Sequence, residues 1–68
     1  MNDAKEALAR AIQSAGGVPK MAQSMGITGQ AIWQWEKVPP LRVLEVERLS
    51  GVSRSELRPD LYPPEGRA

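Results

Sequence analysis

Apolar residues recur every three or four positions along most of the chain, a spacing that gathers them on one face of an α-helix. The first such run begins at Asp3 and stops at Gly16-Gly17. Asp3 and Glu6, three residues apart, come close to the sequence pattern of a capping box. Its apolar positions are Ala4, Leu8, Ala11, Ile12 and Ala15. The run predicts one amphipathic helix that turns its apolar face to the core.

Two shorter runs predict helices over Pro19–Met25 and Gly29–Lys37, and the leading proline suits the opening turn of the first. Gly26 lies where a chain leaving a helix usually turns through positive φ, and Thr28 can cap the following helix. The positions expected to face inward are Met21, Ala22, Met25, Ile27, Ile32 and Trp35. A turn this short between two apolar faces predicts a helix-turn-helix.

Val38-Pro39-Pro40 then breaks the helical pattern, because a residue before proline is driven out of the α region. The next run, up to Gly51, predicts a fourth helix. Its expected inward positions are Leu41, Leu44 and Leu49, with Val43 and Val46 as further candidates. A β-hairpin over Leu41–Val46 is the alternative. Helix is favoured because the run is rich in Leu, Glu and Arg and lacks a turn dipeptide.

A short last helix is predicted after Ser53, which forms a capping box with Glu56, and Pro59 ends it. The chain is therefore expected to be all-α, a small bundle of about five short helices that contains the helix-turn-helix. We expect one domain over residues 1–63 and a flexible tail over 64–68, whose composition is that of a disordered end.

Turning Ile32 and Trp35 inward leaves an outward stripe on the same helix, at about 100° per residue. The stripe consists of Gln30, Trp33, Gln34 and Lys37. A glutamine amide donates and accepts at once, so either glutamine could engage N6 and N7 of adenine in the major groove. Such a pair is worth about 1–3 kcal/mol of discrimination. The plainer alternative is solvated polar surface.

Ala22, Gly26 and Ile32 have the spacing of a small residue, a glycine four positions later and an aliphatic residue six after that. In this the chain resembles the phage Cro and repressor superfamily. Further likeness, in Trp35, Pro39–Gly51 and Gly51–Pro63, is to the YdaS-like, Cro-type group of small bacterial and prophage regulators and antitoxins. The resemblance covers Leu8 to Pro63 and implies a lambda repressor-like DNA-binding domain.

Within the helix-turn-helix, the expected base contacts are Thr28, Gly29, Gln30, Trp33 and Gln34, and the expected phosphate contacts are Lys20, Gln23 and Lys37. Trp33 departs from the resembled pattern, in which a small polar residue is usual. Its ring could pack on a thymine methyl or a deoxyribose edge, contact a protein, or fill a gap beside Leu41 or Leu44. The alternative for the two lysines is ordinary solvated charge.

The 68 residues carry a net charge of +1. Basic and acidic residues number two and two in residues 1–17, three and one in 18–42, and four and five in 43–68. So small an excess favours modest affinity from one copy, and a homodimer on a pseudo-palindrome, with recognition helices about 34 Å apart, would strengthen it. The surfaces left over are the fourth helix, the short last helix and the tail, including Leu57, Leu61 and Tyr62. They could bind a partner in solution, pair only on DNA, or fold back on the chain's own core.

The chain has no cysteine and no histidine, which excludes disulfides, thiolate metal sites, cysteine nucleophiles and histidine bases. Its acidic and serine residues lie mostly at expected helix caps or solvated faces, so we expect no catalysis, metal or cofactor. No apolar run approaches the ~20 residues of a membrane span, and the N-terminus lacks the apolar core of a signal peptide. We expect a cytoplasmic protein without a membrane partner.

The leading hypothesis is a sequence-specific, double-stranded DNA-binding transcriptional regulator of phage or prophage type, a repressor that occupies an operator. The alternative is an antitoxin-like protein-interaction module whose main contact is a cognate toxin or a polymerase subunit. The low net charge and an exposed, apolar Trp33 would favour the alternative.

Overall fold

The computed structural model describes residues 3–63. Its elements are α1 (Asp3–Ser14), α2 (Val18–Met25), α3 (Gly29–Trp33), the 3₁₀ segment η1 (Pro40–Arg42), α4 (Val43–Ser50) and α5 (Arg54–Leu57). These residues form no strand, so the all-α prediction is confirmed and the β-hairpin alternative for Leu41–Val46 is wrong. The tail predicted over 64–68 lies outside the described residues.

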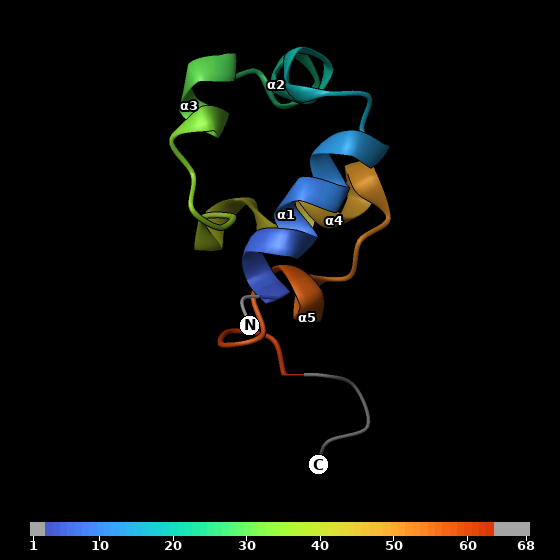
Figure 1. The fold of residues 1–68 in the computed structure, drawn as a ribbon, viewed down its shortest axis with the longest axis vertical. Coiled ribbons are helices and arrows are strands. Elements are labelled where there is room, and N and C mark those ends of the chain that lie inside the picture. Colours follow the sequence, from blue (N-terminus) through green and yellow to red (C-terminus); the bar gives the residue numbers. More distant parts are fainter. Residues whose placement is uncertain (1–2, 64–68) are drawn as a thin grey trace.

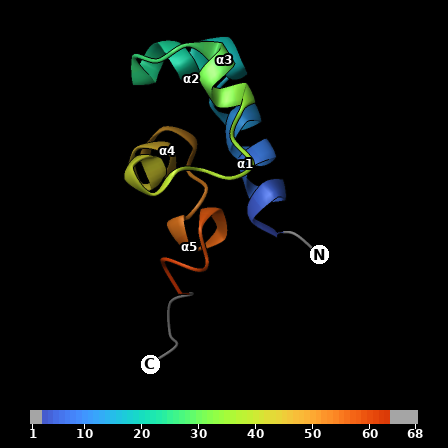
Figure 2. The same cartoon turned by 90° about the vertical axis from the view of Figure 1, so that its left-hand side faces the viewer.

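The helices form a three-helix body with a two-helix unit across one end (Figure 1). α1 is the central element, because it contacts α2, α4 and α5, while α2 and α3 pack against each other. A view turned by 90° shows α4 and α5 on one side of α1, with α2 and α3 together beyond its end (Figure 2). The unit formed by α2 and α3 thus packs against the three-helix body mainly through the contact between α1 and α2.

The core confirms most of the predicted inward positions on the first two helices. Leu8 and Ala11 on α1 are buried, as are Met21, Ala22 and Met25 on α2. Ala7 is also fully buried, although the sequence analysis did not include it. The remaining expected positions of the first helix are half-buried: Ala4 and Ile12 on α1, and Ala15 just after it.

The inward face of α4 is not the one expected. Leu41 is 97% exposed and Leu44 is 48% exposed, whereas Val43 and Val46 are fully buried. The two prolines before Leu41 lead into the 3₁₀ turn η1, which winds at three residues per turn and shifts the phase of the following helix. The valines, three positions apart, therefore face the core and the leucines face solvent.

The third helix is shorter than predicted, because α3 ends at Trp33 rather than at Lys37. The N–H of Gln34 is shared between two carbonyls of the preceding turn, and that of Trp35 donates to Ile32 O at 3.0 Å, a 3₁₀-type bond. Trp35 consequently packs against the core from the loop, half-buried, rather than from the helix face on which it was placed.

The early end of α3 has its cause downstream, at Val38. A residue before proline avoids the α region, and Val38 is fully buried. Its carbonyl accepts a hydrogen bond of 2.8 Å from Nη1 of Arg58, twenty residues further along the chain. The chain must leave the helix several residues earlier in order to bring Val38 to this position.

The C-terminal segment folds back partly on the chain's own core, which is one of the alternatives that the sequence leaves open. Leu57 is fully buried and Tyr62 packs against the core, while Leu61 is 43% exposed. One half of the predicted capping box is confirmed, because Oγ of Ser53 accepts from the N–H of Glu56 at 3.2 Å. The carboxylate of Glu56 pairs with Arg10 and so ties α5 to α1.

Candidate nucleic-acid interface

The turn between α2 and α3 has the predicted geometry. Gly26 takes φ 72° and ψ 29°, a left-handed conformation that only glycine adopts at little cost, and the N–H of Ile27 returns to Ala22 O at 3.0 Å. Thr28 is extended, and its Oγ1 accepts from the N–H of Ala31 at 3.2 Å. With Ile32 buried, the arrangement is compatible with a helix-turn-helix.

Gly29, one of the expected base contacts, has a packing role at the start of α3. It is half-buried, and a Cβ at this position would lie 3.3 Å from Cγ1 of Val18 on α2. That contact is tight for a methyl group, so glycine allows the two helices to approach. Any contact of Gly29 with a base would have to come from its backbone, and that contact stays a prediction.

The outer side of α3 carries the residues proposed to read DNA. Gln30, Trp33 and Gln34 are exposed, as predicted, with Gln34 at the C-cap. Within residues 3–63, no intramolecular hydrogen bond engages the amide of either glutamine side chain. Trp33 is 74% exposed, so it does not fill a gap beside Leu41 or Leu44. Two amides and an indole are therefore available to a partner.

The expected phosphate contacts come from two segments, α2 and the loop after α3. Lys20 and Gln23 are exposed on α2, as expected. Lys37 is exposed in the loop, and the prediction that it ends the third helix is wrong. The ion-paired hydrogen bonds from Arg58 lower the pKa of Asp60 to about 2, and the positive charge of Lys37 contributes to the lowering.

Arg58, which the sequence analysis did not single out, holds the loop after α3. The residue is 8% exposed, and its Nε and Nη2 donate to the two carboxylate oxygens of Asp60 at 3.0 and 2.8 Å. These bonds also raise the pKa of Arg58. The same guanidinium donates to Val38 O, so it joins the loop to the C-terminal segment. The Arg-Pro-Asp sequence is a local signal for the ion pair between Arg58 and Asp60. No nearby residue indicates that Arg58 also binds the carbonyl of Val38.

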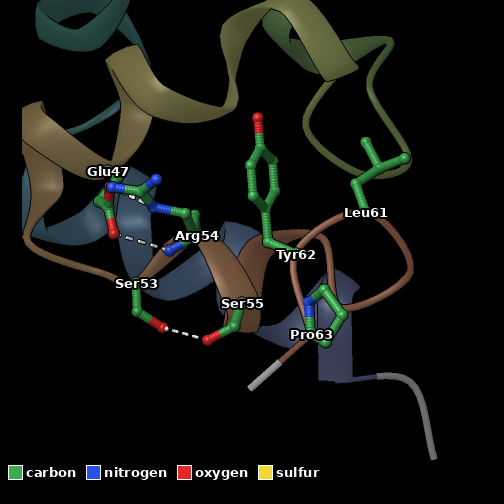
Figure 3. Close-up of a pocket in the computed structure, with 7 residues that line it drawn as sticks. All are labelled: Glu47, Ser53, Arg54, Ser55, Leu61, Tyr62 and Pro63. Carbon is green, nitrogen blue, oxygen red and sulfur yellow. Dashed lines mark hydrogen bonds and ion pairs between the residues drawn. The ribbon is translucent and has the colours of Figure 1, made fainter. Parts of the chain in front are cut away.

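A hollow of about 430 Å³ lies beside α5, and its polar side chains bind one another (Figure 3). Arg54 lines it, and the carboxylate of Glu47 accepts from the backbone N–H of Arg54 at 2.9 Å and from its Nε at 3.2 Å. The Arg54 guanidinium also lies 5.7 Å from the centre of the Tyr62 ring. Because its charged groups already have partners, this hollow is a weaker candidate for ligand binding than the outer side of α3.

Residues 3–63 contain no group of three or more His, Cys, Asp or Glu side chains that could hold a metal ion. Among the helices of the same segment, none is long and apolar enough to cross a bilayer.

Comparison with protein families identifies the chain. The model of the family described as bacterial toxin YdaS matches residues 8–65. The chain belongs to the YdaS family. The resemblance expected over Leu8 to Pro63 is thereby confirmed. No curated protein and no solved structure matches this YdaS-family chain. The family description associates the chain with small bacterial toxin-related proteins, and it specifies no operator.

Proposed function

We propose that this YdaS-family chain is a sequence-specific, double-stranded DNA-binding transcriptional regulator of Cro or repressor type, a repressor that acts by occupying an operator. The observation that supports this proposal best is the outer side of α3, where the amides of Gln30 and Gln34 are exposed and unpaired. Both follow a turn whose geometry Gly26 and Thr28 restrict, so their backbone positions are set before a partner arrives.

The polar side chains of α2 and α3 suit different parts of a DNA duplex. Exposed amides at α3 suit base edges, whereas Lys20 and Gln23 on α2 suit phosphates. With a net charge of only +1, a single copy has little non-specific affinity, so we propose that two copies bind a pseudo-palindromic operator. The proposal involves no catalytic step.

Selection of duplexes from a random pool, followed by binding at one salt concentration, tests the proposal. We expect an enriched motif, and we expect Gln30→Ala or Gln34→Ala to lower the ratio of operator to random-duplex affinity by about 5- to 150-fold. Gln13→Ala is the matched control, because Gln13 is also an exposed helical glutamine but lies on α1. If no motif is enriched, or if all three variants keep the wild-type ratio, α3 does not read DNA.

The second candidate is an antitoxin-like module that binds a cognate toxin or a polymerase subunit. Two observations favour it, the 74% exposure of Trp33 and the family description. An exposed indole is typical of protein interfaces, in which tryptophan is enriched. The same random-pool selection separates the candidates, because a module of this kind would enrich no DNA motif.

A further inference from the structure

An apolar groove of about 420 Å³ opens between the α2–α3 unit and η1. Its apolar lining comes from Ile27, Ala31, Trp35, Pro39, Pro40 and Leu41, with Arg42 at one edge. α3 and the segment that follows it lie on the same side of the molecule (Figure 1). The proposed DNA-reading side of α3 and this groove are therefore neighbours, because Ala31 belongs to α3 as well as to the groove.

Leu41 lines one edge of this groove, and almost all of its side chain is exposed to solvent. Its 97% exposure is extreme for a leucine, and Leu44 three residues later is 48% exposed. The backbone here is stiff, because Pro39 and Pro40 precede Leu41 and the N–H of Arg42 donates to Pro39 O at 2.9 Å. A leucine held rigidly beside an apolar groove loses little conformational freedom when it enters a second groove.

We propose that this face binds a second copy of the chain, with Leu41 of each copy entering the groove of the other. A two-fold symmetric interface uses one patch twice, so the patch must hold both a projection and a complementary hollow. Leu41 and the groove are such a pair.

The charges around the groove favour a second copy over a strongly charged partner. Arg42 and Glu45 form a loose ion pair of 3.3 Å, both side chains being partly exposed. The patch thus presents one charge of each sign, and two copies could exchange these partners across a two-fold axis. A nucleic-acid backbone would instead require a positive excess. Residues 64–68, Pro-Glu-Gly-Arg-Ala, offer no large apolar side chain for the groove.

The size of the patch predicts a weak, concentration-dependent dimer. The apolar surface is one groove and two leucines, which is small beside the ~800 Å² per partner of a standard interface. Self-association itself needs no DNA. If the proposed function holds, such a dimer presents two α3 helices to one duplex, and this consequence rests on that function.

Sedimentation equilibrium of the full chain without DNA, from ~10 µM to ~1 mM, tests the proposal. We expect a reversible monomer–dimer equilibrium, and we expect Leu41→Glu to raise the dissociation constant at least ~100-fold. Leu61→Glu is the control, because Leu61 is also an exposed leucine but lies on the other hollow, and it should leave the equilibrium unchanged. Circular dichroism verifies that both variants are folded.

Tryptophan fluorescence gives a second, local readout. The chain has two tryptophans, so Trp33→Phe leaves Trp35, which lines the groove, as the only one. Its emission should move to longer wavelength on dilution as the groove becomes hydrated. The proposal is overturned if the wild-type chain stays monomeric over the whole concentration range. It is also overturned if the dimers of the Leu41→Glu and Leu61→Glu variants have the same dissociation constant. An intact dimer whose Gln30→Ala variant keeps the wild-type DNA preference would count against the DNA proposal alone.

Discussion

Replacing Arg58 by methionine tests whether the C-terminal segment holds the loop after α3. Methionine keeps much of the length of the arginine stem but cannot donate a hydrogen bond. The change removes the bond from Nη1 to Val38 O, 2.8 Å long, and leaves the carbonyl of a fully buried residue without that donor. It also removes both bonds to Asp60.

The expected loss follows from the bond to Val38. A hydrogen bond from a charged donor is worth about 1.5–3 kcal/mol, so we expect Arg58→Met to lower the free energy of unfolding by about 2 kcal/mol. A chain of 68 residues has a total stability of roughly 3–10 kcal/mol. The variant should therefore lose a large share of its stability, and its Tm should fall by about 10 °C.

Urea unfolding at pH 7, followed by circular dichroism, measures this loss. Arg54→Met is the matched control, because the Arg54 side chain is 49% exposed and its ion pair with Glu47 should contribute less than about 1 kcal/mol. The fluorescence of Trp35, in the loop that Arg58 holds, should change in the folded state of the Arg58 variant only. Equal destabilisation by the two substitutions would refute the idea that Arg58 holds this loop.

Two further predictions concern the same C-terminal segment. Leu57→Ala should destabilise the fold by about 2.7–5 kcal/mol, while Leu61→Ala, the same change at a side chain that is 43% exposed, should cost far less, and thermal melting compares them. Because Arg58 lowers the pKa of Asp60 from 3.8 to about 2, the ionised carboxylate stabilises the fold above pH 4, and this contribution is lost as the pH falls toward 2. Urea midpoints from pH 5 to pH 2 should thus fall more steeply for the wild type than for Asp60→Asn, and parallel curves would show that the pair does not affect stability.

Local interactions explain why the turn between α2 and α3 could be predicted from the sequence. Gly26 takes positive φ and Thr28 caps α3 because both conformations depend on residues within one turn of the chain. The buried positions of α2 follow from side chains three and four residues apart. The outward placement of Gln30, Trp33 and Gln34 then follows from the inward placement of Ile32.

The incorrect prediction for α4 concerns a segment in which two local patterns compete. After Pro40 the chain offers a leucine stripe and a valine stripe, and the sequence analysis favoured the leucines. The structure buries Val43 and Val46 and exposes Leu41, because the 3₁₀ turn sets the phase of α4. Helical spacing permits both stripes, so hydrophobicity alone could not separate them.

The all-α class, the turn between α2 and α3, and the residues exposed on α3 could therefore be read from the sequence, since each depends on contacts within a few residues. The end of α3, the buried face of α4 and the place of Leu57 in the core depend on tertiary contacts instead. The reason is that Val38 reaches the core together with Arg58, twenty residues away, and no periodicity along the chain encodes a contact of that separation.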